Sequence, residues 1–272
     1  MLALLRANAR GARLIAHLFT GMALVVVTRL SFGRLPPEPR TRWWNARLLK
    51  ILNVRVRVHG TPLRGRRLIV CNHISWLDIS VVAACELTRF VSKAEVGNWP
   101  IAGWLANAAG TFYIRRGAGG TKLLIQALVE HLRGGGSAVV FPEGTTTGGD
   151  TMLKFQPRLF AAAIDSGSPV QPLALRYSRA ANGENIAAFV GEQTLTANLR
   201  RVLMERELWV ELHYCEPLRP QEGQDRASLA NAAHAAICAV VAPGELAAPG
   251  VAAESESLAA CAPAGFSWFP FL

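Results

Sequence analysis

Residues 67–78, RLIVCNHISWLD, decide the fold of this chain and carry its most informative polar residues. The apolar run at 68–71 is short and uninterrupted, which is typical of a buried strand. Asn72 and His73 follow at once, and a helical pattern begins near Trp76. We therefore expect His73 at the end of a strand, directly before a helix.

His73 and Asp78 form an H-x-x-x-x-D pattern. On a regular helix, two residues five positions apart lie roughly 140° apart around the axis, so their side chains would not share a helix face. They can meet only if the residues between them form a turn. In that arrangement the carboxylate fixes one imidazole nitrogen while the other faces a substrate. The competing interpretation is an ordinary surface or core histidine.

The basic residues are concentrated near the N-terminus. The 272-residue chain has 29 Lys and Arg, 19 Asp and Glu, and a net charge of +10. Residues 1–67 contain 14 of the basic residues and one acidic residue, Glu38. This pattern favours an anionic membrane surface as a partner. Nucleic acid is the competing partner, and we expect none, because the basic residues surround apolar sequence rather than alternate with stacking aromatics.

An apolar segment, LIAHLFTGMALVVVT at 14–28, lies between Arg13 and Arg29. As a helix it would be about 22 Å long, shorter than the roughly 30 Å hydrocarbon core of a bilayer. We therefore predict a helix that lies in the membrane interface or enters one leaflet; a cleaved signal peptide is the alternative. Residues 32–41, with three prolines, are expected to connect it to a second amphipathic helix with tryptophans at 43 and 44.

Strand and helix patterns alternate through the rest of the chain. Strict alternation at 54–58 predicts an edge or half-exposed strand. Further strands are predicted at 68–72, 89–92, 111–115, 137–141, 170–175 and 208–214, and helices at 76–86, 101–108, 120–133, 155–166 and 226–241. This alternation predicts an α/β fold with a mostly parallel central sheet covered by helices.

The chain divides into three regions by composition. Residues 1–50 are predicted to be a membrane-associated helical segment, and residues 51–242 the α/β domain. Ala, Gly, Pro, Ser and Glu dominate residues 243–272, which show no periodicity and predict a disordered tail.

The five cysteines are scattered and include no C-x-x-C pair. Their odd number and spacing disfavour a disulfide framework or a zinc site and indicate a reducing compartment. We predict no metal and no bound cofactor.

Arginines follow another predicted strand. The segment GTFYIRR at 110–116 ends in Arg115 and Arg116, whose guanidinium groups suit a phosphate or carboxylate. The alternative is a solvated charge pair. Pro172, within the apolar segment VQPLAL at 170–175, indicates that this strand is at an edge or contains a bulge.

A polar loop, FPEGTTT at 141–147, follows the strand predicted at 137–141. It places Glu143, Gly144, Thr145 and Thr146 at the end of a strand, where open α/β sheets have their sites. The alternative is an ordinary turn.

Together, the segments NHISWLD, GTFYIRR, FPEGTTT and VQPLAL resemble the four ordered motifs of the glycerolipid acyltransferases, over about residues 50–242. The bacterial members that acylate 1-acyl-sn-glycerol-3-phosphate are the most similar. The resemblance implies transfer of a fatty acyl group from acyl-CoA or acyl carrier protein to the free hydroxyl of 1-acyl-sn-glycerol-3-phosphate (lysophosphatidic acid), which gives phosphatidic acid. It also implies a location at the cytoplasmic face of the bacterial inner membrane.

The same resemblance implies roles for the site residues. His73 would be the general base, Asp78 would orient its imidazole, and Arg115 would bind the lysolipid phosphate. The other implied substrate-binding residues are Glu143, Gly144, Thr145, Thr146 and Pro172, the last on the acyl-donor side.

Thr146 departs from the family pattern, because many members have an arginine there. A hydroxyl donates to phosphate but brings no charge, so the acceptor stays open. A lysolipid without a phosphomonoester, such as lyso-ornithine lipid, is the alternative acceptor. A thioesterase and a catalytically silent membrane-binding protein are the alternatives to an acyltransferase.

Overall fold

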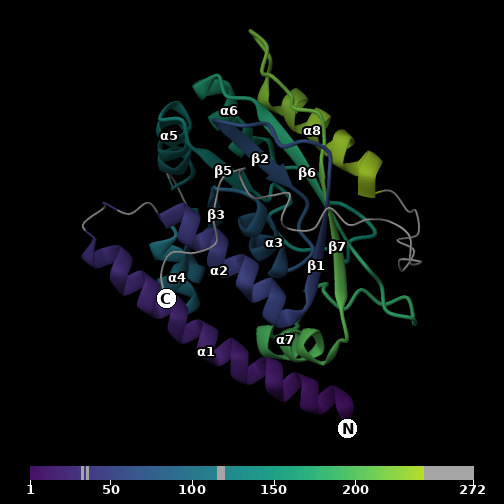
Figure 1. Ribbon diagram of the computed structural model, residues 1–272. Helices are drawn as coiled ribbons and strands as arrows, with labels where there is room; N and C mark the ends of the chain where they lie inside the picture. The colour runs from purple at the N-terminus through teal and green to yellow at the C-terminus, as the bar shows by residue number, and fades with distance from the viewer. Residues whose placement is uncertain (32–33, 35–36, 115–119, 242–272) are drawn as a thin grey trace.

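The computed structural model describes residues 1–31, 34, 37–114 and 120–241. A seven-stranded sheet runs through its centre in the order β1-β7-β6-β2-β5-β3-β4 (Figure 1). The strands are β1 Val54–His59, β2 Arg67–Cys71, β3 Arg89–Lys93, β4 Phe112–Ile114, β5 Ser137–Val140, β6 Val170–Tyr177 and β7 Leu208–Tyr214. Strands β6, β2, β5, β3 and β4 are parallel; β7 is antiparallel to β6, and β1 is parallel to β7. The prediction of a mostly parallel sheet is therefore confirmed.

Helices cover both faces of this sheet. They are α1 Leu2–Leu30, α2 Pro37–Leu52, α3 Leu77–Cys85, α4 Ala102–Ala108, α5 Gly120–Arg133, α6 Ala161–Ser166, α7 Leu195–Met204 and α8 Arg226–Val241, with short 3₁₀ helices at Ala94–Asn98 and Pro157–Phe160. One core lies between the sheet and helices α2 and α3, and the other between the sheet and helices α5, α6 and α8. All of β2 is buried, which explains its uninterrupted apolar sequence.

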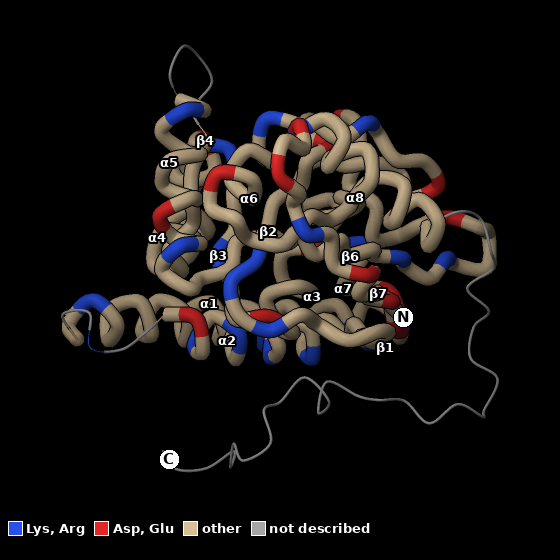
Figure 2. The backbone as a smooth tube through the Cα atoms, turned by 90° about the horizontal axis from the view of Figure 1, so that it is seen from above, with Lys and Arg blue, Asp and Glu red and all other residues tan. Residues whose placement is uncertain are grey.

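The N-terminal helix is longer than the predicted segment. Helix α1 covers 29 residues and is long and apolar enough to cross a membrane. It nevertheless lies along one side of the domain, next to α2, α4 and α7 (Figure 1). Basic residues are distributed along α1 and α2 (Figure 2). The guanidinium of Arg10 donates to the carbonyls of Leu203, in the last turn of α7, and of Glu205 and Arg206, just beyond it. These contacts tie the first half of α1 to the domain.

Helix α2 begins at Pro37, inside the region expected to be a connector. Proline is tolerated in the first turn of a helix, where its missing N–H would have no intrahelical partner. Leu48 and Leu49 of α2 are buried in the core of the α/β domain, although the predicted boundary at residue 50 assigns them to the N-terminal segment. The predicted disordered tail at 243–272 lies outside the described residues.

Pro172 lies in an interior strand, so the prediction of an edge was wrong for β6. The bulge was the better alternative. Leu173 pairs with Tyr214, whereas Val170 pairs with Leu218, so the neighbouring chain carries one extra residue between these pairs. The missing N–H of Pro172 therefore lies where the antiparallel ladder is already interrupted.

One helical prediction needed revision, and one helix had no prediction. The helix expected at 155–166 is a 3₁₀ turn followed by the six residues of α6. Helix α7 was not predicted; the Thr194 hydroxyl accepts from the N–H of Ala197 and caps its first turn.

Candidate active site

The turn between β2 and α3 brings His73 and Asp78 together. Strand β2 ends at Cys71 and α3 begins at Leu77, so His73 lies in the turn and Asp78 in the first turn of α3. Nδ1 of His73 lies 2.8 Å from Oδ2 of Asp78. The Asp78 side chain is fully buried, whereas 19% of the His73 side chain is exposed. The contact expected from the H-x-x-x-x-D spacing is thus present, and it engages Nδ1 of His73 rather than Nε2.

The buried carboxylate of Asp78 has four hydrogen-bonding partners. Besides His73, its Oδ2 atom accepts from the backbone N–H groups of Ile74 at 2.6 Å and Ser75 at 2.9 Å. Its Oδ1 atom accepts from the Tyr177 hydroxyl at 2.7 Å. These donors compensate a buried negative charge and fix the plane of the carboxylate. The imidazole is therefore held in one orientation.

Tyr177, at the end of β6, was not found from the sequence. Burial and then the nearby Asp78 charge hold the pKa of Tyr177 well above its ordinary value, so the hydroxyl stays protonated and donates. Tyr177 is 99 residues from Asp78 along the chain, and no local pattern links them.

Asn72 fixes the end of β2 against β6. Its Nδ2 atom donates to the Leu175 carbonyl at 3.0 Å, and its Oδ1 atom accepts from the Leu175 N–H at 2.8 Å. The side chain thus continues the sheet pairing where the β2 backbone turns away. Sequence reasoning gave Asn72 no role, although its place directly before His73 was the available signal.

Glu143 holds the backbone of the same turn. Its side chain is buried, Oε1 accepts from the N–H of His73, and Oε2 accepts from the N–H of Leu153, both at 2.8 Å. Burial raises the pKa of Glu143, and the two N–H donors oppose that shift. The ring of Phe141 stacks on the His73 imidazole with centroids 4.1 Å apart. The FPEG segment therefore positions His73 from two sides.

Gly144, Thr145 and Thr146 form the rest of this loop. Gly144 has a φ of 75°, and an added Cβ would lie 2.8 Å from Nε2 of Gln156. Thr145 is exposed, whereas Thr146 is partly buried and its hydroxyl donates to the Phe189 carbonyl. The Thr146 hydroxyl is therefore used to join two loops.

Two predicted site residues remain, Arg115 and Pro172. Arg115 lies outside the described residues; Ile114, which precedes it, ends β4 at the sheet edge. Three strand spacings separate β4 from β2, or about 14 Å. Pro172 is buried within the sheet and pairs with Val70 of β2.

Comparison with known proteins finds a matching family and similar proteins. Residues 55–176 match the family described as Acyltransferase. A lyso-ornithine lipid O-acyltransferase of Pseudomonas aeruginosa is 42% identical over 243 residues, which cover 87% of this chain and 93% of that protein. A 1-acyl-sn-glycerol-3-phosphate acyltransferase of Neisseria gonorrhoeae is 31% identical, over 64% of this chain and 69% of that protein.

The fold also has a counterpart among solved structures. The crystal structure of the 1-acyl-sn-glycerophosphate acyltransferase PlsC from Thermotoga maritima superposes with a TM-score of 0.65 and covers 88% of this chain and 94% of that one. At 19% identity this likeness supports the fold alone. The extent of the 42% match, together with the family match across β1 to β6, shows that the chain belongs to the glycerolipid acyltransferase family.

Proposed function

We propose that this acyltransferase esterifies the free hydroxyl of a lyso-ornithine lipid. The observation that carries the choice of acceptor is Thr146, which is neutral where many family members have an arginine, and whose hydroxyl proton is already donated to Phe189. A phosphomonoester carries up to two negative charges, whereas an ornithine headgroup carries a carboxylate and a protonated amine. The relatives at 42% and 35% identity, both named lyso-ornithine lipid O-acyltransferases, support the same choice.

The chemistry we propose is direct transfer with general base help from His73. Nε2 of His73 removes the proton of the acceptor hydroxyl, and the hydroxyl oxygen attacks the carbonyl carbon of an acyl thioester. The tetrahedral intermediate then expels the thiolate, which takes the proton from the imidazolium, so an ester forms and a thiol leaves. Asp78 stabilises the imidazolium. General base help of this kind accelerates a reaction by about 10²–10⁴-fold.

Acyl-CoA or acyl carrier protein would supply the thioester. Both donors are acidic, and the net charge of +10 favours their encounter with this chain. We propose no cofactor beyond this co-substrate.

The N-terminal helix supports a membrane surface as the place of reaction. Several large apolar side chains of α1 face solvent, among them Ile15 at 58%, Phe19 at 63% and Val27 at 51% exposure. Arg10, on the other side of the helix, is buried against the domain. We infer that α1 lies in the interface with this apolar side in lipid, at the cytoplasmic face of the inner membrane.

The second candidate acceptor is 1-acyl-sn-glycerol-3-phosphate. The Neisseria relative favours it, as does Arg115, which the family resemblance assigns to phosphate.

A lysolipid panel tests the acceptor. The purified full chain in detergent micelles is given labelled acyl-CoA or acyl carrier protein with lyso-ornithine lipid, 1-acyl-sn-glycerol-3-phosphate or no acceptor. We expect acyl transfer to lyso-ornithine lipid. The rate of this transfer should fall by at least about 10²-fold in the His73→Ala variant. Transfer only to the phosphate-bearing lipid would overturn the acceptor, and fatty acid release without an acceptor would indicate a thioesterase.

A further inference from the structure

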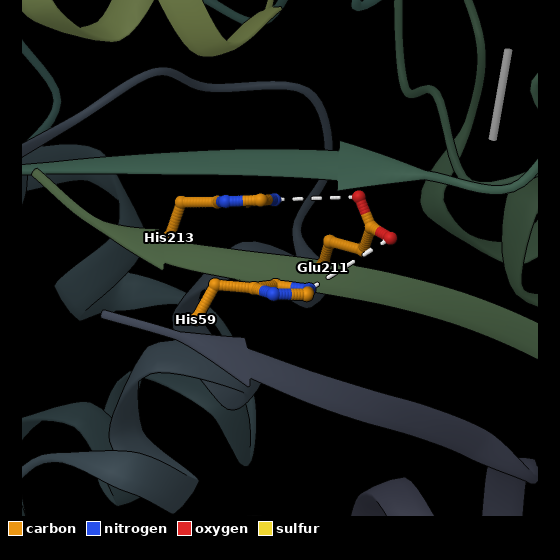
Figure 3. Close-up of side chains that lie close together, drawn as sticks. All are labelled: His59, Glu211 and His213. Carbon is orange, nitrogen blue, oxygen red and sulfur yellow. Dashed lines mark hydrogen bonds and ion pairs between the residues drawn. The ribbon is translucent and has the colours of Figure 1, made fainter. Parts of the chain in front are cut away.

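Three side chains converge on the open face of strands β1 and β7, away from the acyl-transfer site. His59 ends β1 and pairs in register with His213 of β7, while Glu211 is two residues earlier in β7. The two imidazole rings stack with centroids 4.2 Å apart and planes 11° from parallel. Both rings present a nitrogen to the Glu211 carboxylate (Figure 3). Nε2 of His213 lies 3.3 Å from Oε2, and Nε2 of His59 lies 3.8 Å from Oε1.

We propose that His59, Glu211 and His213 bind a divalent transition-metal ion of the zinc class. Two imidazoles and one carboxylate are a ligand set that zinc takes in proteins, with the fourth position open to water. Ligands about 2.0–2.1 Å from a tetrahedral ion are about 3.3 Å from one another. The three ligand atoms lie within 4.8 Å of one another, so small rotations of the side chains close the site.

The sheet makes this arrangement rigid. Glu211 and His213 point to the same face because side chains alternate along a strand, and the register of β1 supplies the third ligand. The intervening residue Leu212 is fully buried on the other face, which anchors β7 under the site. His59 is the most accessible ligand, with 45% of its side chain exposed, and provides an entry for the ion from solvent.

A neighbouring cation limits the affinity that we expect. The Arg176 guanidinium of β6 lies 3.8 Å from Oε2 of Glu211 and repels a metal ion. We therefore expect micromolar binding.

The position of the site indicates a structural role. Strand β7 is separated from β2, which carries His73, by β6 alone, or about 10 Å between strand axes. An ion held by His59 and His213 would fasten the edge strand β1 to β7, and so raise the unfolding temperature without taking part in acyl transfer.

Calorimetric titration of the untagged, chelator-treated full chain in detergent with zinc tests the proposal. We expect one ion per chain, no response to magnesium, and visible absorption bands of a four-coordinate site when cobalt replaces zinc. The His59→Ala/His213→Ala double variant should bind at least about 100-fold more weakly and Glu211→Gln at least about 10-fold more weakly. Arg55→Ala, a change on the same face of β1, should bind as the wild type does.

The outcomes separate this site from the proposed function. Failure of the wild type to bind at millimolar zinc, or unchanged binding by the double variant, would overturn the metal site. Zinc should raise the unfolding temperature of the wild type but not of the double variant, with the same rate of acyl transfer in both. The zinc titration does not require acyl transfer, so it tests the metal site even if the protein transfers no acyl group.

Discussion

Replacement of Glu143 by glutamine tests whether the FPEG loop positions the turn that carries His73 or binds substrate. The carboxylate receives two N–H donors, those of His73 and Leu153, and is buried. A glutamine oxygen accepts only one of them, and its NH₂ group then faces the other donor. One charge-assisted hydrogen bond is lost and a buried N–H is left without a partner, so we expect the free energy of unfolding to fall by about 2–4 kcal/mol.

The kinetic effect of Glu143→Gln follows from the same contacts. Because Glu143 holds the backbone of His73, its loss shifts the imidazole relative to the acceptor hydroxyl. A displacement of about 1 Å lowers the rate of transfer by about 10–100-fold. We expect kcat to fall by that factor and the acceptor KM to stay nearly unchanged, since the substrate-binding groups are intact.

The assay measures initial rates over a range of lysolipid concentrations, together with thermal unfolding. Glu130→Gln, the same change of charge at an exposed position of α5, is the matched control and should leave both quantities unchanged. A variant with normal kcat, normal stability and a strongly raised acceptor KM would refute the positioning role and place Glu143 in contact with substrate.

Tyr177→Phe removes one of four partners of Asp78, so kcat should fall by only about 3–30-fold, with an unchanged acceptor KM in the same assay. Ile15→Gln with Phe19→Gln should lower partition into anionic vesicles by at least about 100-fold in sedimentation, because each side chain contributes about 1.5–3 kcal/mol when buried in lipid, while circular dichroism stays unchanged. Burial lowers the pKa of His131, so below about pH 6.5 the unfolded chain binds more protons than the folded chain. The free energy of unfolding, measured by denaturant titration, should therefore fall as the pH drops below about 6.5, and it should fall less in His131→Gln than in the wild type.

The main elements of the fold could be predicted because their signals are local. Helix α5 buries Leu124, Leu128 and Leu132, which recur every four residues, and its predicted limits match those observed. Strand β2 is buried on both faces, so its apolar run was clear. Helix α7 was missed because Asn198, which is fully buried, interrupts the apolar side of the helix.

Asn198 shows why such a residue cannot be placed from its neighbours. Its Oδ1 atom accepts from Nε1 of Trp76, which ends the turn between β2 and α3, and its Nδ2 atom donates to the Ala188 carbonyl. From the sequence, an asparagine is expected to be exposed. Its burial depends on hydrogen-bond partners that only the fold brings to it.

The sequence by itself determined the alternation of strands and helices, the family, and the His73–Asp78 pair, because each depends on residues close together along the chain. Only the tertiary structure decided that Tyr177 and Glu143 hold that pair, that Thr146 joins two loops, and that α1 lies along the domain. The physical reason is that a buried polar group requires partners, and these come from segments that only the folded sheet brings together.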